Sequence, residues 1–178
     1  GTTRQWEAIE IGEGNEKLLS ANLTGVLATS GTCGDNARWE LSEDYTTLTI
    51  SGTGAVTSHP WANAARVVET IIVEEGITSL CDGAFYDFEI VTEVRLPETL
   101  TAIGASSFRN NCALPALVLP AGLTKLGDNA FTWCSSLKSM VIPEGITAIP
   151  EHLLSYCEAL ESVEMSENVT AIGASAFI

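Results

Sequence analysis

Phenylalanine recurs along this chain with a period of 23 residues. Phe85, Phe108, Phe131 and Phe177 lie one or two periods apart, and Leu154 fills the vacant place. Other rows keep the same spacing: Leu80, Ile103, Leu126, Ile149 and Ile172; Thr78, Thr101, Thr124, Thr147 and Thr170; Pro97, Pro120 and Pro143. A unit this short cannot bury an apolar face alone, so the repeat predicts units stacked into an array with a continuous core.

Each unit contains two apolar segments. Residues 137–142 alternate and contain β-branched side chains, which predicts a short strand, and Pro143 ends it because proline has no amide hydrogen to donate. Residues 145–149 turn the chain, and the Ala130-Phe131 pair indicates one helical or 3₁₀ turn. We expect a curved parallel sheet with short turns or 3₁₀ segments. The threonine row hints at a second row of strands, which the sequence leaves open.

The units share the motif L-x-x-V-x-I-P-x-G-[IV]-T-x-I-G-x-x-A-F-x-x-C, seen at residues 114–134 and 137–157. Over residues 67–178 it resembles the BspA-like leucine-rich repeats of bacterial surface proteins. The resemblance implies a leucine-rich repeat solenoid of four full units and a truncated fifth, which stops at Phe177 and Ile178. Folding back of this end and end-to-end association through it both stay open.

The units depart from the common leucine-rich repeat in two ways. The position that usually carries an asparagine holds Gly76, Thr99, Gly122, Gly145 and Asn168. An asparagine ladder is therefore not expected there, and another hydrogen-bonding scheme must hold the turns. The fourth unit has Pro150 and Leu154 where the others have glycine and phenylalanine, so we expect an uneven convex side.

Residues 1–66 do not follow the repeat and are expected to form a separate N-terminal segment. Residues 7–21 contain Glu, Lys and Leu and give weak support for a short helix. Residues 38–41 and 47–51 alternate on either side of a polar turn, which predicts a β-hairpin broken at Gly52 and Gly54. This stretch is similar to the segment that precedes the repeats in the same family, and its expected role is to cap the array.

Charge and composition exclude several function classes. The net charge of -15 offers no basic surface for nucleic acid or for an anionic membrane. No apolar stretch is long enough to span a bilayer, so we expect no membrane insertion. The sequence begins at Gly1 without a leader, and we interpret it as a mature form.

Groups that carry chemistry are sparse. His59 and His152 have neither zinc-ligand spacing nor a nucleophile motif nearby, so we expect no catalytic residues, no metal site and no cofactor. Cys134 and Cys157 lie one period apart, a position where cysteine usually acts as a small buried apolar residue. A disulfide between Cys33 and Cys81 is left open.

Two sets of residues are candidates for partner binding. The central outward row of the predicted sheet contains Ile72, Arg95, Val118, Val141 and Glu164. Its aliphatic members form a candidate exposed patch, although ordinary β-propensity explains them equally well. Tyr86, Trp133 and Tyr156 follow the phenylalanine row and could anchor a protein or stack on sugar rings. Packing over the turn is the alternative.

The resemblance implies a non-catalytic module at a bacterial surface, secreted or attached, that adheres to host matrix or cell-surface proteins through its concave sheet. A structural spacer that displays another domain is one alternative. A carbohydrate-binding accessory module is another. The sequence predicts neither the ligand nor the oligomeric state.

Overall fold

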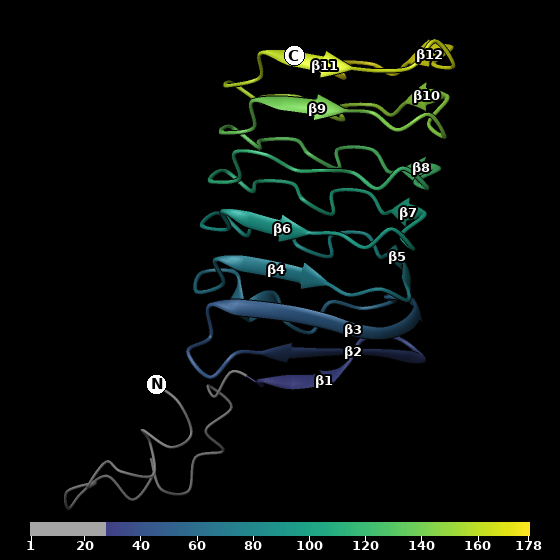
Figure 1. The fold of residues 1–178 in the computed structure, drawn as a ribbon. Helices are drawn as coiled ribbons and strands as arrows, with labels where there is room; N and C mark the ends of the chain where they lie inside the picture. The colour runs from purple at the N-terminus through teal and green to yellow at the C-terminus, as the bar shows by residue number, and fades with distance from the viewer. Residues whose placement is uncertain (1–27) are drawn as a thin grey trace, which may run out of the picture.

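The computed structural model describes residues 28–178, in which 23-residue turns stack along one axis above an N-terminal hairpin (Figure 1). The prediction of a repeat solenoid with parallel strands is confirmed. The helix predicted over residues 7–21 lies outside the described residues.

The first parallel sheet is built from the alternating segment of each unit. Its strands fall into two groups with a gap between them: β3 (Thr47–Ala55), β4 (Thr70–Val73) and β6 (Glu93–Arg95), then β9 (Ser139–Val141) and β11 (Ser162–Glu164). Partners across it lie one period apart, as in Thr70 with Glu93 and Ser139 with Ser162. Ile71 and Met140 point inward and are buried, as alternation predicts.

A second row of strands lies along another side of the solenoid, as the threonine row hinted (Figure 1). It contains β5 (Ile77–Leu80), β7 (Ala102–Ile103), β8 (Lys125–Leu126), β10 (Ala148–Ile149) and β12 (Ala171–Ile172). Threonine hydroxyls add bonds between units, since Thr101 donates to the Thr78 carbonyl at 3.0 Å and Thr124 to the Thr101 carbonyl at 3.2 Å.

The third side, here called the turn edge, consists of the tight turns that hold the phenylalanine row. Backbone amides donate from one unit to the next along it: Phe85 to Ser107, Phe108 to Ala130, and Phe131 to Leu153, at 2.7 to 3.0 Å. This backbone ladder is one of the hydrogen-bonding schemes that hold the turns together. Two residues per turn have positive φ, which favours turns over 3₁₀ geometry, and the one 3₁₀ helix within residues 28–178 is η1 (Ala62–Ala64).

The predicted β-hairpin is confirmed. Strands β1 (Ser30–Thr32), β2 (Asn36–Leu41) and β3 pair in antiparallel fashion and cover the first end of the stack. The predicted break at the two glycines is wrong, because β3 continues to Ala55 and pairs with both β4 and β5. Gly52 permits this with a φ of 100°, at a point where a Cβ would lie 2.1 Å from the Asn36 carbonyl oxygen.

An aromatic spine runs through the buried core. Trp39, Trp61, Phe85, Phe108 and Phe131 contact one another in that order, with ring centroids 5.3 to 6.0 Å apart. The indole nitrogen of Trp61 donates to the Ala84 carbonyl at 2.7 Å, so its buried polar atom is satisfied. The spine stops in the fourth unit, where the buried side chain is Leu154.

Candidate partner-binding surfaces

The predicted outward row lies on one exposed surface, here called the sheet face. Strand register places Ile72 beside Arg95 and Val141 beside Glu164. Val118 lies between these pairs in a segment without strand pairing, and its side chain is 81% exposed. Val141 is 58% exposed, whereas Ile72 is half-buried. The patch is therefore centred on the two valines.

Carboxylates flank this apolar centre. Arg95 is held by Glu93 at 2.7 Å, an exposed ion pair that leaves little free positive charge on the face. Beyond the strand ends, the Glu75 carboxylate accepts bonds from the amides of Glu98 and Thr99, at 2.9 and 3.3 Å. The face therefore combines an exposed apolar centre with acidic margins.

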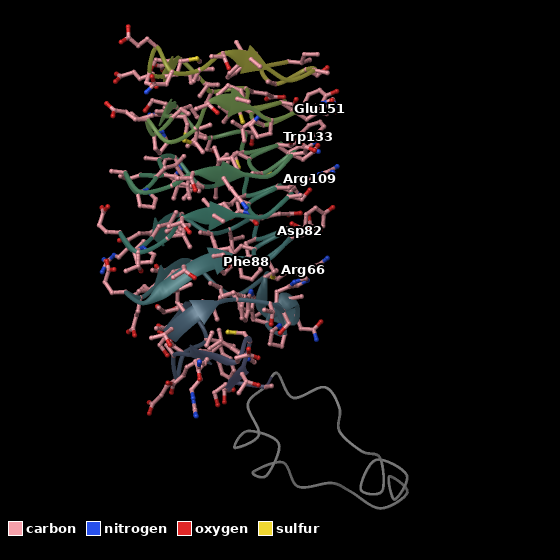
Figure 2. All side chains as sticks on the ribbon, turned by 90° about the vertical axis from the view of Figure 1, so that its right-hand side faces the viewer. Arg66, Asp82, Phe88, Arg109, Trp133 and Glu151 are labelled. Atoms are coloured by element: carbon pink, nitrogen blue, oxygen red, sulfur yellow. The ribbon has the colours of Figure 1, made fainter. Side chains whose placement is uncertain are left out.

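The aromatic residues of the second candidate set lie on the turn edge, but they do not all contact one another. The turn edge is on the opposite side of the stack from the first sheet (Figure 2). Trp133 and Tyr156 stack with centroids 4.3 Å apart and an interplanar angle of 14°. They stay 41% and 46% exposed, so the predicted packing over the turn covers only part of each ring. Tyr86 does not join them and packs against Arg109, whose guanidinium lies 5.8 Å from the Tyr86 ring centre.

Backbone conformation distinguishes the stacked pair from its counterparts. Trp133 and Tyr156 have φ values of 64° and 59°, in the left-handed region that bulky side chains rarely adopt. The first two units have Asp87 and Asn110 at this position, residue types that tolerate the conformation well. Two units therefore hold large exposed aromatics where the backbone favours small polar residues.

Two residues of these surfaces, Arg109 and Asn111, were not predicted from the sequence. Arg109 follows Tyr86 by one period, which was the available signal. Asn111 precedes Cys134 and Cys157 by one and two periods, and all three donate to the carbonyl of a core phenylalanine in the preceding unit. A mixed asparagine–cysteine ladder thus exists, at a different position of the unit from the one where the common leucine-rich repeat has asparagine.

The cysteines of this ladder are buried, and their thiols are poor nucleophiles. Burial raises the pKa of Cys157 to about 11, and burial together with the neighbouring Cys157 raises the pKa of Cys134 further. Both thiols are protonated at neutral pH and act as weak donors, as well as the small buried residues predicted.

Near the hairpin, the structure brings together a thiol and an imidazole that the sequence did not link. Cys81 Sγ lies 3.7 Å from His59 Nδ1, in a depression also lined by Ser58 and Asp82. Burial is the main cause that raises the pKa of the Cys81 thiol, so a thiolate nucleophile is disfavoured. Cys33 is a free thiol, as is Cys81, and the bridge left open by the sequence is not formed.

Within residues 28–178, no cluster of three or more histidine, cysteine, aspartate or glutamate side chains has a metal-binding arrangement. No helix in this part of the chain is long and apolar enough to cross a membrane.

Solved structures share this architecture. A leucine-rich repeat protein from Eubacterium ventriosum is 26% identical, with a TM-score of 0.60 over 78% of this chain and 44% of its own. A leucine-rich cell surface protein from Faecalibacterium prausnitzii is 23% identical, with a TM-score of 0.60 over 82% and 45%. The pneumococcal vaccine antigen PcpA is 21% identical, with a TM-score of 0.53 over 72% and 36%. The chain thus spans less than half the length of these three proteins.

No curated protein sequence matches the chain significantly. The family profile described as "BspA type Leucine rich repeat region" matches residues 62–178 in six copies. This match covers more than half of the sequence, and the 23-residue units, parallel strands and turn edge agree with it. The chain belongs to the BspA-type leucine-rich repeat family of bacterial surface proteins.

Proposed function

We propose that this chain is a non-catalytic adhesive module, displayed at or secreted from a bacterial surface, which binds host matrix or cell-surface proteins through its sheet face. The observation that carries the proposal is the exposure of Val118 and Val141 on adjacent units. Neighbouring exposed aliphatic side chains are typical of interaction sites, although single ones are common on any surface.

The surroundings of the patch support a protein partner. The strands present side chains at regular spacing. The acidic margins of the sheet face would orient a partner that carries basic residues around an apolar centre. The weakly nucleophilic thiols at Cys81 and Cys157 fit a binding role better than a catalytic one.

The test is binding of the purified chain to a panel of immobilised matrix proteins, with the Val141→Glu variant beside it. The glutamate places a charge in the apolar centre, so saturable binding should weaken at least about tenfold, equivalent to about 1.4 kcal/mol. Val141→Thr is the matched control, because threonine keeps the β-branched shape and strand propensity. Circular dichroism must show both variants folded. Binding that survives Val141→Glu contradicts the sheet face, and no saturable binding across the panel favours a spacer.

Carbohydrate recognition is a second candidate, favoured by the exposed stack of Trp133 and Tyr156. Aromatic rings pack against the apolar faces of sugars, and these two lie apart from the sheet face. A glycan panel with Trp133→Asn tests it, because asparagine occupies the same position in the second unit. Glycan binding lost in Trp133→Asn but kept in Val141→Glu would assign that activity to the turn edge.

A further inference from the structure

Pro115 removes a bond from the first sheet. At this position of the unit, the Thr92 amide donates to the Glu69 carbonyl at 2.9 Å and the Glu161 amide to the Lys138 carbonyl at 2.8 Å. Pro115 has no amide hydrogen, so the row lacks the bond to the Thr92 carbonyl between the second and third units. Residues 116–118 form no strand, and the sheet is interrupted between β6 and β9 (Figure 1).

Pro150 removes a bond from the second sheet one unit later. The amides of Gly104, Gly127 and Gly173 donate to the preceding unit at 3.0, 2.9 and 2.8 Å. Pro150 occupies the same position in the fourth unit and has no donor. The second sheet is correspondingly divided between β8 and β10.

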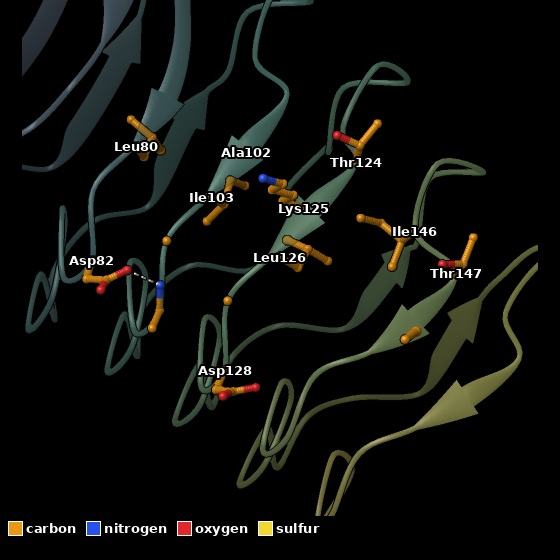
Figure 3. A pocket seen from close by; sticks show the side chains of 14 residues that line it. Leu80, Asp82, Ala102, Ile103, Thr124, Lys125, Leu126, Asp128, Ile146 and Thr147 are labelled. Carbon is orange, nitrogen blue, oxygen red and sulfur yellow. Dashed lines mark hydrogen bonds between the residues drawn. The ribbon is translucent and has the colours of Figure 1, made fainter.

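Pro150 also separates the two strands sterically. A Cβ at Gly127 would lie 2.2 Å from the Ala105 nitrogen, and one at Gly173 would lie 2.6 Å from the Glu151 nitrogen. Units approach too closely at this position for any side chain, so a proline ring does not fit at the spacing of the glycine-bearing units. A depression whose lining includes Lys125, Leu126 and Ile146 extends along the second sheet from β5 to β10 (Figure 3).

The threonine row is also interrupted between the third and fourth units. Thr124 donates to the Thr101 carbonyl through both its amide and its hydroxyl, and Thr170 does so to Thr147. Thr147 makes neither bond to Thr124, although all of these residues are described in the structure. The junction therefore lacks the threonine bonds of the second sheet, although the Glu151 amide still donates to the Asp128 carboxylate across it at 3.1 Å.

The turn edge is continuous across this same junction. The amides of Asn129, Phe131 and Trp133 donate to the fourth unit at 2.9 to 3.0 Å. The Trp133 and Tyr156 rings stack across it, one from each unit. On the first sheet only the Lys138 amide bond to the Pro115 carbonyl remains near the gap, at 3.2 Å.

We propose that the array contains a flexible joint between an N-terminal block, residues 28–136, and a C-terminal block, residues 137–178. The joint pivots on the turn edge and opens toward the two sheets. Val118 and Val141 lie on opposite sides of it, so flexing changes the spacing of the exposed patch. The proposal rests on the backbone ladders and holds whether or not the sheet face binds a partner.

The direct test is NMR residual dipolar couplings of the whole, unmodified chain in a weakly aligning medium. Amide couplings are fitted separately for the two blocks. A flexible joint gives the C-terminal block a different alignment tensor with reduced order, because motion between blocks averages its couplings. A single tensor of equal magnitude for both blocks overturns the proposal.

Repair variants identify the cause. Pro150→Gly installs the residue that other units use at the joint, and it should bring the two tensors together. Pro150→Ala is the matched control, because it restores the amide hydrogen but keeps a Cβ where none fits, so the difference should persist. Distinct tensors in a folded Pro150→Gly variant would show that Pro150 does not cause the joint and would overturn its assignment to this residue.

Discussion

The N-terminal and C-terminal blocks are built from the same repeat but are held together differently. Eight strands, β1 to β8, form one connected network in the N-terminal block, and the aromatic spine passes through it. The C-terminal block has two separate pairs, β9 with β11 and β10 with β12, and Leu154 in place of an aromatic ring.

This difference shows that in a solenoid the period alone does not set the strength of each interface. Stability of such arrays is approximately a sum of unit and nearest-neighbour terms, so one weak interface divides the whole. The turn edge preserves the spacing of the units across Pro115 and Pro150 because its bonds come from the backbone of a different segment. Substitutions in the two blocks should therefore have unequal effects.

The largest expected effect is in the aromatic spine. Phe108→Ala should lower the free energy of unfolding by about 3–5 kcal/mol, because it leaves a cavity and removes ring contacts with both Phe85 and Phe131. Leu154→Ala, the equivalent change in the C-terminal block, should cost less, since no ring contacts are lost. Denaturant titration measures both, and an equal or larger loss in Leu154→Ala would contradict the contribution of the spine.

Trp61 tests the link between the hairpin and the first unit. Trp61→Phe keeps a ring but removes the indole donor to the Ala84 carbonyl, which stays buried. The expected loss is about 1–3 kcal/mol. Thermal and denaturant unfolding should both report it. Wild-type stability in Trp61→Phe would mean that the Ala84 carbonyl finds another donor.

Alkaline pH should weaken the cysteine ladder. The pKa of Cys157 is about 11 in the folded chain and lies above that of an unfolded thiol, so folding favours the protonated form. Its contribution is complete below about pH 8.5 and is lost as pH rises toward 11, at most about 3 kcal/mol. Cys157→Ser keeps a donor for the Phe131 carbonyl and should flatten this part of the pH profile. An unchanged profile would contradict the assignment.

The smallest effect concerns the threonine row and compares the junctions directly. Thr124→Val removes a hydroxyl bond to the Thr101 carbonyl and should cost about 0.5–1.5 kcal/mol. Thr147→Val removes a hydroxyl without such a bond to Thr124 and should be nearly neutral. Equilibrium unfolding of the pair measures the difference. Equal losses would place Thr147 in a bond with the third unit.

Much of the fold follows from the spacing of residues in the sequence. The rows through Phe108 and Thr124 predict stacked units, and alternation predicts which side chains of β4 and β9 are buried. Pro150 was recognisable as a departure, but its consequence depends on how closely neighbouring glycines approach the preceding unit. Pro115 gave no comparable warning, because proline is common elsewhere in the repeat.

The candidate surfaces were predicted unevenly for a similar reason. Strand alternation placed Val118 and Val141 on an exposed face, because a strand has a fixed two-residue period. Turn geometry has no such rule, so the left-handed backbone at Trp133 and its stacking on Tyr156 were not foreseen. Tyr86 lies two units before Trp133 and differs from it by one position within the unit, and it packs against Arg109 instead.

Native-state amide hydrogen exchange of the unmodified chain can show whether the two blocks are separated at the sheets, because it reports on the amides of the turn edge and of the sheets separately. We expect slow exchange at Phe131 and Trp133, whose amides cross the junction, and at Thr124 and Thr170 beside the second sheet. Thr147 should exchange much faster than either threonine. Protection of Thr147 equal to that of Thr124 and Thr170 would contradict the division of this solenoid into two blocks.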